Sequence, residues 1–404
     1  MKILMISTTF PYPPTRGATQ VRTFNLLKYL SERHAITLVT QRSEDITDIE
    51  VEKLQQWVEE LVIFPQPQPS EQEEGLKEKL QRWSTILQQG TPQKVLQLYS
   101  TPMQQWVDQA VEAGKFDLIT CEHSTNEIYV RPEWRKQLRT LVNIHHSVYR
   151  KSLDKLETKT SDNQLKDKLN LPLLRRYEEQ YCAKFTDIIV TTAEDRRQID
   201  SFELDSKITL ISNGVDVHLF PRRISDPGGH RLVFTGAMDN PLNIKAARYF
   251  SLDVFPAITE RYGDTKLELV GPKPVQAVLE LEDIPGISVT GSVPSLVDHL
   301  HKATIFVVPM QSGFGVKNKT LEAMAAGVPV VGSDRGLEGL TVDGGDVPLR
   351  ALRANDTTEY VYAISRLFED RQLRKQLSEN GRAYIEQKYT WERAGELYEQ
   401  VITG

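Results

Sequence analysis

The sequence predicts an α/β protein built from two doubly wound domains. Short runs of apolar and β-branched residues recur along the chain, as expected of parallel strands that are buried on both faces. Glycine-containing loops and amphipathic segments alternate with these runs in the order strand, loop, helix, strand. The chain has 404 residues, and single cores rarely exceed roughly 250–300 residues. Two domains are therefore expected.

The first half of the chain opens with this order. We expect a buried strand at residues 2–7, a loop containing Arg16 and Gly17, a helix at 20–30 with one apolar face, and a second strand at 35–40. The remainder of this half is expected to hold a polar helical segment at 70–112 and strands at 61–64, 117–121, 140–144, 187–191 and 208–211.

The second half restarts the same order after residues 221–229, where Pro, Gly and charged residues cluster. The expected elements are strands at 231–235, 266–270, 287–290, 305–308 and 328–331, and helices at 243–250, 275–281, 321–325 and 372–402. The predicted domains are residues 1–221 and 222–385, and residues 386–404 are expected to form a helix that packs back on the first domain.

Composition limits the class of protein. The net charge of −6, from 49 basic and 55 acidic residues, argues against a nucleic-acid binder. Cys121 and Cys182 lack metal-ligand spacing, and two thiols in such a chain fit a reducing compartment better than a disulfide. Residues 1–7 are too short an apolar run for a signal peptide, and no stretch approaches the roughly 20 apolar residues of a membrane span. We expect a cytoplasmic protein, attached at most to the inner face of a membrane.

The most informative segment is 303–334, where a buried strand, a glycine loop, a short helix and a second buried strand follow one another. Gly313 and Gly315 break the chain after the first strand, and Gly327 ends the helix. Backbone amides in such a loop, with the positive end of a helix behind them, form a binding site for phosphate.

Charged side chains complete the predicted phosphate site. Lys317 and Lys319 add positive charge, and Glu322 lies on the first helical turn, where a carboxylate can hold ribose hydroxyls. Asn318 is equally suited to cap the helix or to bind ligand. The alternative is that the two lysines only keep a surface loop soluble. The segment as a whole predicts a nucleoside-diphosphate site.

Several motifs carry a resemblance to a known family. They occur in order along the chain: Ser212-Asn-Gly-Val-Asp216, Gly236 with Pro241 and Asn243, Val289-Thr-Gly-Ser-Val293, Lys319-Thr-Leu-Glu-Ala-Met-Ala-Ala-Gly327-Val-Pro-Val-Val331, and Tyr389-Thr-Trp391. Together they resemble the GT-B glycosyltransferases of family 4. The resemblance is strong over residues 205–400 and weak over 1–200.

The resemblance implies a GT-B fold, in which two Rossmann-like domains face a cleft. It implies an acceptor-binding first domain and a second domain that binds a nucleotide-sugar donor, either a UDP- or a GDP-sugar. The implied reaction is a retaining transfer of the sugar that needs no metal or other cofactor. Consistent with this, the sequence has no Asp-x-Asp pair of the kind that holds a divalent cation in other glycosyltransferases.

The resemblance also assigns site residues. Glu322 matches the glutamate that hydrogen-bonds the donor ribose. The loop that approaches the donor sugar and diphosphate matches Gly313, Phe314, Gly315 and Val316, and the main chain that reads the base edge matches Gly291, Ser292 and Val293. Arg16, Gly17 and Ala18 match a loop that closes over the diphosphate. Gly236 and Asn318 complete the expected donor-binding set.

The chain departs from the family pattern at two places. Many relatives have a second glutamate eight positions before the ribose-binding one, and here that position is Phe314. Relatives often carry Arg and Lys after the first strand of the second domain, whereas this chain has Gly236-Ala-Met-Asp-Asn-Pro. We expect Lys317 and Lys319 to act as catalytic replacements, because the leaving nucleotide gains negative charge as the glycosidic bond breaks.

A histidine is expected at the acceptor side. Relatives often carry one after the strand at 117–121, and His123 is the match; an imidazole there can accept or relay a proton. His145 and His146 follow the next strand and compete for this role. A purely structural role for His123 is an equally common outcome for a histidine at such a position.

Residues 150–184 contain nine Lys or Arg and six Asp or Glu, interleaved with leucines. Such a segment can rest on an anionic membrane, as in relatives with lipid-linked acceptors. The alternative is a solvated helix of mixed charge. The expected partners are a nucleotide-sugar donor and a glycan or lipid-linked acceptor in polysaccharide, lipopolysaccharide or glycolipid biosynthesis.

Two other functions fit the sequence. One is a nucleotide-sugar epimerase of the same two-domain architecture, which needs no acceptor. The other is a non-catalytic relative that serves as an assembly partner. Phe314 and the missing Arg and Lys support the second alternative, whereas Glu322 and the glycine loop oppose it.

Overall fold

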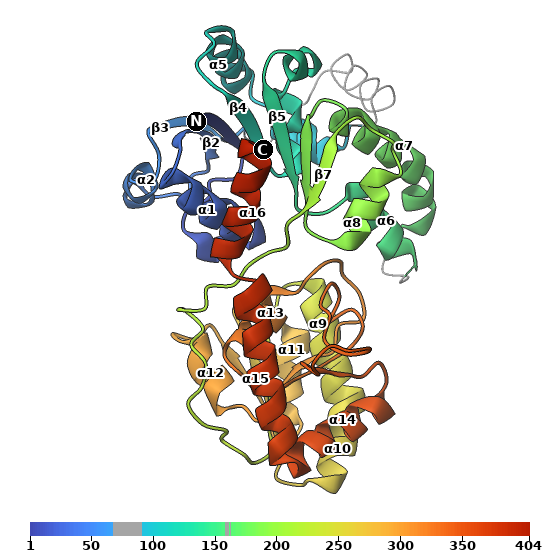
Figure 1. Ribbon diagram of the computed structural model, residues 1–404. Coiled ribbons are helices and arrows are strands. Elements are labelled where there is room, and N and C mark those ends of the chain that lie inside the picture. The colour runs from blue at the N-terminus through green and yellow to red at the C-terminus, as the bar shows by residue number, and fades with distance from the viewer. Residues whose placement is uncertain (68–90, 158–160, 162) are drawn as a thin grey trace. The chain divides into compact units, whose positions relative to one another are not determined.

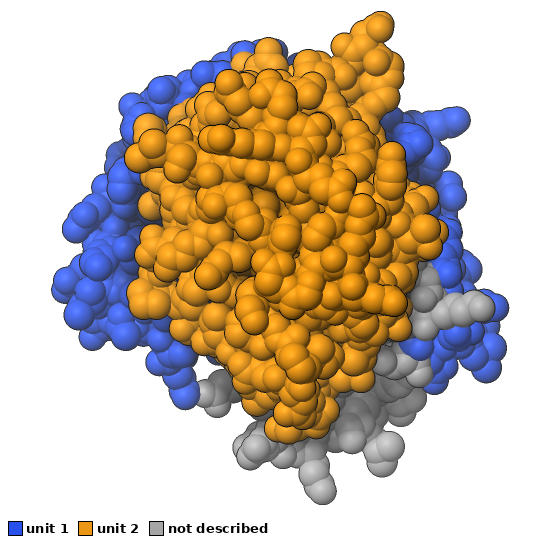
Figure 2. All heavy atoms as spheres, turned by 90° about the horizontal axis from the view of Figure 1, so that it is seen from below, with its two compact units in different colours: residues 1–212, 394–404 blue, residues 213–393 orange. Residues whose placement is uncertain are grey.

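The computed structural model describes residues 1–67, 91–157, 161 and 163–404. The chain folds into two compact units, which are coloured separately in Figure 2. Unit 1 comprises residues 1–212 and 394–404, and unit 2 comprises residues 213–393. Part of the polar helical segment predicted at 70–112 lies outside the described residues.

Unit 1 contains a seven-stranded sheet in the order β3-β2-β1-β4-β5-β6-β7, in which all neighbours are parallel. Its strands are β1 (Lys2–Ser7), β2 (Ala35–Arg42), β3 (Glu60–Pro65), β4 (Leu118–Glu122), β5 (Arg139–Ile144), β6 (Asp187–Val190) and β7 (Lys207–Leu210). The central strands are buried on both faces, which explains their continuous apolar sequences. All seven strands fall where the sequence predicts them, with ends shifted by one or two residues.

Helices flank this sheet (Figure 1). They are α1 (Ala18–Ser31), α2 (Asp48–Gln55), α4 (Gln93–Gln97), α5 (Thr101–Glu112), α6 (Val148–Glu157), α7 (Gln164–Cys182), α8 (Ala193–Asp200) and α16 (Trp391–Thr403), with 3₁₀ helices η1 (Pro14–Arg16), η2 (Ser124–Tyr129) and η3 (Pro132–Lys136). Helix α16 lies beside α1 although the rest of the chain separates them, and the Tyr29 hydroxyl donates to Glu399 at 3.3 Å.

A buried polar network joins α16 to the sheet of unit 1. Arg22, only 1% exposed, donates to Asn143 Oδ1 at 3.0 and 3.1 Å. Asn143 donates to Glu122 Oε2 at 2.8 Å, and the Tyr398 hydroxyl donates to Glu122 Oε1 at 2.6 Å. The network satisfies a carboxylate and a guanidinium that would otherwise be costly to bury.

Unit 2 repeats the architecture with a six-stranded parallel sheet in the order β10-β9-β8-β11-β12-β13. Its strands are β8 (Arg231–Thr235), β9 (Lys266–Val270), β10 (Ile287–Gly291), β11 (Ile305–Val308), β12 (Val330–Gly332) and β13 (Leu352–Arg353). Its helices are α9 (Pro241–Tyr249), the π-helix η4 (Phe250–Val254), α10 (Phe255–Arg261), α11 (Gln276–Leu279), η5 (Glu280–Asp283), α12 (Leu296–Lys302), α13 (Asn318–Ala325), α14 (Thr357–Glu369) and α15 (Arg371–Lys388). Strand β13 was not predicted, because two residues give no readable alternation.

The units divide at Ser212 and Asn213, not at the predicted residues 221–229. The reason is that Val215 already belongs to unit 2: its N–H donates to Tyr389 O at 2.8 Å, and it forms a parallel bridge with Thr390. The predicted helical segment at 372–402 is two helices, α15 and α16, separated at Tyr389 and Thr390. Residues from Ala394 onward belong to unit 1.

No helix in the described ranges is long and apolar enough to cross a membrane.

Candidate functional site

The two sheets share one strand order, and this order locates the site in each unit. In open parallel sheets, ligands bind outside the carboxyl ends of the strands, at the point where the strand order reverses direction. In unit 2 this point lies between β8 and β11, which lead into Gly236 and the glycine loop, defined here as Gly313 to Lys317. In unit 1 it lies between β1 and β4, which lead towards Gly17 and His123. In contrast, Gly291 ends the edge strand β10, and Ser292 and Val293 follow it.

Glycines at the ends of β8 and β9 let two backbones approach closely. Gly236 and Gly271 have φ of 152° and 154°, and a Cβ at Gly271 would lie 1.9 Å from Gly236 O. Gly271 N–H donates to Gly291 O at the end of β10, at 3.2 Å. The ends of three neighbouring strands thus form one continuous backbone rim, which includes the predicted Gly291.

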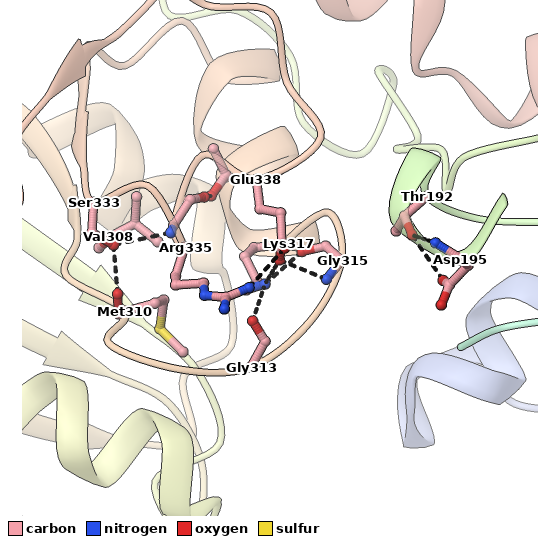
Figure 3. Close-up of polar contacts among 12 residues, drawn as sticks. Thr192, Asp195, Val308, Met310, Gly313, Gly315, Lys317, Ser333, Arg335 and Glu338 are labelled. Atoms are coloured by element: carbon pink, nitrogen blue, oxygen red, sulfur yellow. Dashed lines mark hydrogen bonds and ion pairs between the residues drawn. The ribbon is translucent and has the colours of Figure 1, made fainter. Parts of the chain in front are cut away.

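Lys317 stabilises the glycine loop from within. Its Nζ donates to Gly313 O at 3.1 Å and also to Gly315 O, so the loop wraps around the ammonium group (Figure 3). It also pairs with the carboxylate of Glu338 at 3.4 Å. The predicted catalytic lysine therefore points into its own loop in this structure.

Lys319, two residues further along the chain, contacts residues outside the glycine loop, in α9 and at the end of β8. Its Nζ donates to Asn243 Oδ1 at 2.7 Å and lies 4.2 Å from the centroid of the Phe234 ring. A Cβ at Gly236 would lie 2.6 Å from this Nζ. Asn243 in turn donates to Ala237 O at 2.9 Å. Lys319 thus places its amine directly after β8, next to the segment 236–241, which has no Arg or Lys of its own.

Burial lowers the pKa of Lys319 to about 7, against the opposing attraction of Glu322. Burial also raises the pKa of Glu322 to about 7, although Lys319 favours its ionised form. No hydrogen bond or ion pair of the Glu322 carboxylate occurs among the described residues. A partly exposed carboxylate with spare acceptor capacity thus lies one helical turn from a partly desolvated amine.

Helix α13 begins with an uncapped N-terminus. Its N-cap residue is Lys317, which makes no side-chain cap hydrogen bond, so Asn318 is the first helical residue and not the cap. The Asn318 side chain instead accepts from Asn213 Nδ2 at 3.2 Å. Thr320 N–H already donates to Lys317 O at 2.9 Å, so the amides of Asn318 and Lys319 are the ones that this N-terminus can offer to an anion.

The other donor-site residues predicted from sequence lie near this N-terminus or along the strand ends. Phe314 lies beneath the Arg335 guanidinium, whose carbon is 5.5 Å from the ring centroid. Val316 packs against the core of unit 2, whereas Ser292 is exposed and Val293 is half-buried.

The turn after β12, which sequence reasoning missed, organises the glycine loop. Glu338 accepts from Gly315 N–H at 2.8 Å and from Arg335 Nη1 at 2.9 Å (Figure 3). Thr320 of α13 donates to Gly336 O at 2.9 Å. No sequence signal near Glu338 indicated this role, because the contact depends on the parallel pairing of β11 with β12.

A groove of about 530 Å³ runs along α9 and the π-helix. Its lining includes both apolar and charged side chains: Pro241, Ile244, Lys245, Arg248, Tyr249, Leu252, Asp253 and Gln311. The groove approaches the glycine loop through Gln311, and Leu242 packs directly against Gly313.

In unit 1 the three competing histidines form one cluster. The ring centroids of His123 and His145 are 4.9 Å apart, and those of His123 and His146 are 5.5 Å apart. Burial lowers the pKa of His123 to about 4 and that of His146 to about 3, with Lys151 adding to both shifts. Burial also lowers the pKa of His145 well below its usual value. All three imidazoles are therefore neutral near pH 7.

The hydrogen bonds of His123 define which ring nitrogen carries the proton. His123 Nδ1 accepts from Thr125 N–H at 3.1 Å, so a neutral ring bears its proton on Nε2. His123 also has a φ of 101°, which is strained for a non-glycine residue. This geometry presents an N–H donor from His123 and occupies the nitrogen that would act as a base.

Arg16 and Gly17 lie at the start of α1. Arg16 pairs with Glu50 at 2.8 Å and with Asp45, so its guanidinium is bound to two carboxylates within unit 1. Gly17 is extended and serves as the residue before the helix. Their predicted role over a diphosphate stays a prediction.

Cys121 and Cys182 are buried free thiols. Among the residues that the structure describes, no group of three or more His, Cys, Asp or Glu side chains could hold a metal ion.

Family models match most of the chain in two consecutive segments. Residues 19–219 match the model described as Glycosyltransferase Family 4, and residues 229–370 match the model described as Glycosyl transferases group 1. The chain has the GT-B glycosyltransferase fold. YtcC of Bacillus subtilis (strain 168) is 30% identical over 105 residues, which cover 25% of this chain and 26% of YtcC. That match spans about a quarter of the length of this relative.

Solved GT-B structures match over the whole chain. Sucrose-phosphate synthase of Thermosynechococcus elongatus aligns with a TM-score of 0.66 and 17% identity, covering 99% of this chain and 98% of the other. HepE of Anabaena, solved in complex with UDP, aligns with a TM-score of 0.65 and 14% identity over 100% of both chains. TarM of S. aureus, solved with UDP among its ligands, has a TM-score of 0.63 and 13% identity over 100% of both.

Proposed function

We propose that this protein is a retaining glycosyltransferase that moves a sugar from a UDP- or GDP-sugar to a glycan or lipid-linked acceptor. The family matches and the GT-B fold support the class of enzyme. HepE, which binds UDP and UDP-glucose in its solved complexes, supports a nucleotide-sugar donor. The proposed setting is polysaccharide, lipopolysaccharide or glycolipid assembly on the cytoplasmic side of a membrane.

One observation carries the proposal: the N-terminus of α13 combines uncapped amides, the Lys319 amine and the Glu322 carboxylate at the reversal point of the sheet. The amides and Lys319 suit a diphosphate, because both favour negative charge. Glu322 suits the paired hydroxyls of a ribose, because an ionised carboxylate is a pure acceptor with several free lone-pair positions.

The proposed reaction forms a bond from the acceptor oxygen to the anomeric carbon, as the bond from that carbon to the diphosphate oxygen breaks. The acceptor proton passes to an oxygen of the leaving nucleoside diphosphate. Lys319 and the α13 amides stabilise the charge that develops on this group. No metal is assigned to this step, since Lys319 supplies a cation after β8.

His123 is proposed to act as a donor through Nε2–H. It would orient a hydroxyl and would not remove a proton, because Nδ1 is bound to Thr125. Unit 1 is proposed to bind the acceptor, and helices α6 and α7 are proposed to rest on the membrane. The exposure of Leu165 (71%) and Leu169 (69%), one turn apart on α7, supports this contact. Part of the predicted membrane segment, residues 158–160 and 162, lies outside the described residues.

A thermal-shift screen with UDP, GDP, ADP and CMP and their common sugar conjugates tests the proposal. A ligand that binds only the folded state stabilises it by about 2.7 kcal/mol at a hundredfold excess over its dissociation constant. We expect one nucleotide to raise the Tm clearly. A panel with no response would favour the non-catalytic assembly partner, and conversion of a free nucleotide sugar without any acceptor would favour the epimerase.

A further inference from the structure

Glu338 contacts two residues of the glycine loop directly and supports a third through Arg335. One oxygen, Oε2, accepts from Gly315 N–H at 2.8 Å and lies 3.4 Å from Lys317 Nζ. The other, Oε1, accepts from Arg335 at 2.9 Å, and Arg335 covers the ring of Phe314. A single carboxylate, with its side chain 11% exposed, therefore contacts Gly315 and Lys317 (Figure 3). Through Arg335 it also supports Phe314.

The turn that carries Glu338 is itself fixed to the end of β11. Ser333 Oγ donates to Met310 O and accepts from Gly336 N–H at 3.0 Å. A Cβ at Gly336 would lie 2.2 Å from Val308 O, so the turn can lie this close only with glycine there. Because the turn is held to the strand that precedes the loop, Glu338 has a defined position from which to restrain it.

Two positive side chains share the negative charge of Glu338. The Glu338 carboxylate lies between the Lys317 ammonium and the Arg335 guanidinium, and hydrogen bonds to ionised groups are stronger than neutral ones. Glu338 also engages Gly315 N–H, which directs that amide towards the turn. The loop is thereby shaped around Lys317 and leaves the N-terminus of α13 uncapped.

We propose that Glu338 is a positioning residue of the donor site: it holds the glycine loop in the shape that keeps the N-terminus of α13 open to the diphosphate. Glu338 acts through Gly315 and Lys317 and does not touch the donor. This inference rests on the proposed function for the identity of the ligand. The contacts by which Glu338 restrains the loop are present without ligand, so they can be tested in the ligand-free protein.

The test compares Glu338→Ala and Glu338→Gln with the wild type in two measurements. The first is hydrogen exchange of loop residues 311–317 in the ligand-free protein. We expect faster exchange in Glu338→Ala and partial rescue in Glu338→Gln, because the glutamine carbonyl still accepts from Gly315 N–H but carries no charge for Lys317. Wild-type exchange rates in Glu338→Ala would overturn the proposal.

The second measurement is calorimetric titration with UDP and UDP-glucose. We expect Glu338→Ala to weaken both about tenfold to a hundredfold, the range for loss of a charged hydrogen bond. The double variant with Lys317→Met should lose less than the sum of the single changes. Glu369→Gln, which breaks a 2.7 Å pair with Arg261 elsewhere in unit 2, is the matched control and should bind normally.

The outcomes separate the two claims. If the wild type binds neither UDP nor UDP-glucose, a uridine nucleotide fails as the donor, while the exchange measurement still decides the role of Glu338. If the wild type binds and Glu338→Ala binds equally well, the positioning role is overturned.

Discussion

At the scale of single residues, Lys317 and Lys319 have different surroundings despite similar positions in the sequence. Lys317 bonds to carbonyls of its own loop, whereas Lys319 reaches Asn243 and the end of β8. The sequence predicted two interchangeable cations, because spacing in a loop does not reveal where a flexible side chain will find its partners. We therefore propose Lys319, and not Lys317, as the cation for a leaving diphosphate.

The pair Lys319 and Glu322 predicts a bell-shaped pH dependence of donor binding with its maximum near pH 7. Donor binding needs Glu322 ionised and Lys319 protonated, and each pKa is about 7. As pH falls, Glu322 takes up a proton and ribose binding weakens. As pH rises, Lys319 loses its proton and diphosphate binding weakens. Calorimetric titration between pH 5.5 and 8.5, about one and a half units either side of the maximum, measures both limbs.

Two variants show which of the two groups causes each limb of the pH profile. Glu322→Gln should remove the acid limb and Lys319→Met the alkaline limb, with weaker binding in both. Glu322→Gln should also raise the Tm of the ligand-free protein, because it removes a carboxylate whose charged form is disfavoured by burial. Retention of both limbs in the variants would contradict this assignment.

The histidine cluster predicts that the stability of unit 1 falls in mild acid. A histidine with a depressed pKa in the folded state contributes stability that is present above pH 6.5 and lost as pH falls towards about 4, because the unfolded chain takes up the proton first. Each such histidine changes the free energy of unfolding by up to about 1.4 kcal/mol per pH unit. Urea unfolding at several pH values, compared between wild type and His146→Gln, measures how much His146 contributes to this pH-dependent change in the free energy of unfolding.

The comparison with His146→Gln is needed because Glu178 changes the stability of unit 1 with pH in the opposite direction. Burial raises its pKa to about 7, so its contribution is lost as pH rises towards 7. A pH slope unchanged in His146→Gln would show that His146 is not held neutral by the fold.

At the scale of secondary-structure elements, the sequence predicted the strands better than the connections. Strands buried on both faces have continuous apolar sequences, such as Ile305–Val308, and these runs are readable without a structure. The break between α15 and α16 was missed, since both sides are amphipathic and Tyr389 and Thr390 contain no glycine or proline. The boundary at Asn213 was also missed, because Val215 joins unit 2 through long-range contacts with Tyr389 and Thr390 that no local pattern reveals.

The close approach of β8 and β9 predicts that Gly271→Ala strongly destabilises unit 2. The new Cβ would lie 1.9 Å from Gly236 O at a φ of 154°, so the clash with backbone adds to conformational strain. We expect a loss of at least about 3 kcal/mol, measured by urea unfolding. Gly344→Ala is the control: its φ is also positive, at 87°, but no atom lies within 4 Å of the new Cβ. Similar losses in the two variants would refute the importance of the close approach.

At the scale of the whole molecule, the last helix of the chain belongs to unit 1. Tyr398 of α16 donates to Glu122, and Arg139 donates to Ile402 O at 2.8 Å. The packing of the C-terminus on the first domain was predicted from the sequence, whereas its anchor was not. A tyrosine in an amphipathic helix gives no signal for a partner 276 positions away.

This anchor predicts that Tyr398→Phe destabilises unit 1 by about 1–3 kcal/mol, because the buried Glu122 carboxylate loses a hydrogen bond. Scanning calorimetry should show a lower transition for unit 1 and an unchanged transition for unit 2. Tyr362→Phe removes the hydroxyl of an exposed tyrosine on α14 and serves as the control. Equal unfolding profiles for Tyr398→Phe and wild type would contradict the anchoring role of this hydroxyl.

The residues of the candidate site could be predicted where they lie close together in the sequence, but not where they come from separate helices, strands and turns. Glu322, Lys319 and the glycine loop lie within one segment, and local spacing was enough to find them. Asn243, Arg335 and Glu338 come from other elements, and parallel strand order brings them to the same edge. The three histidines competed in the sequence for one role, and the structure places them in one cluster.

The central claim is that the N-terminus of α13 binds a nucleotide-sugar donor, and titration calorimetry with UDP-glucose at pH 7, near the two pKa values of about 7, tests it most directly. We predict saturable binding by the wild type and a loss of about tenfold or more in Glu322→Ala, with the fold retained. Binding that is unchanged in Glu322→Ala would contradict the assignment of the site.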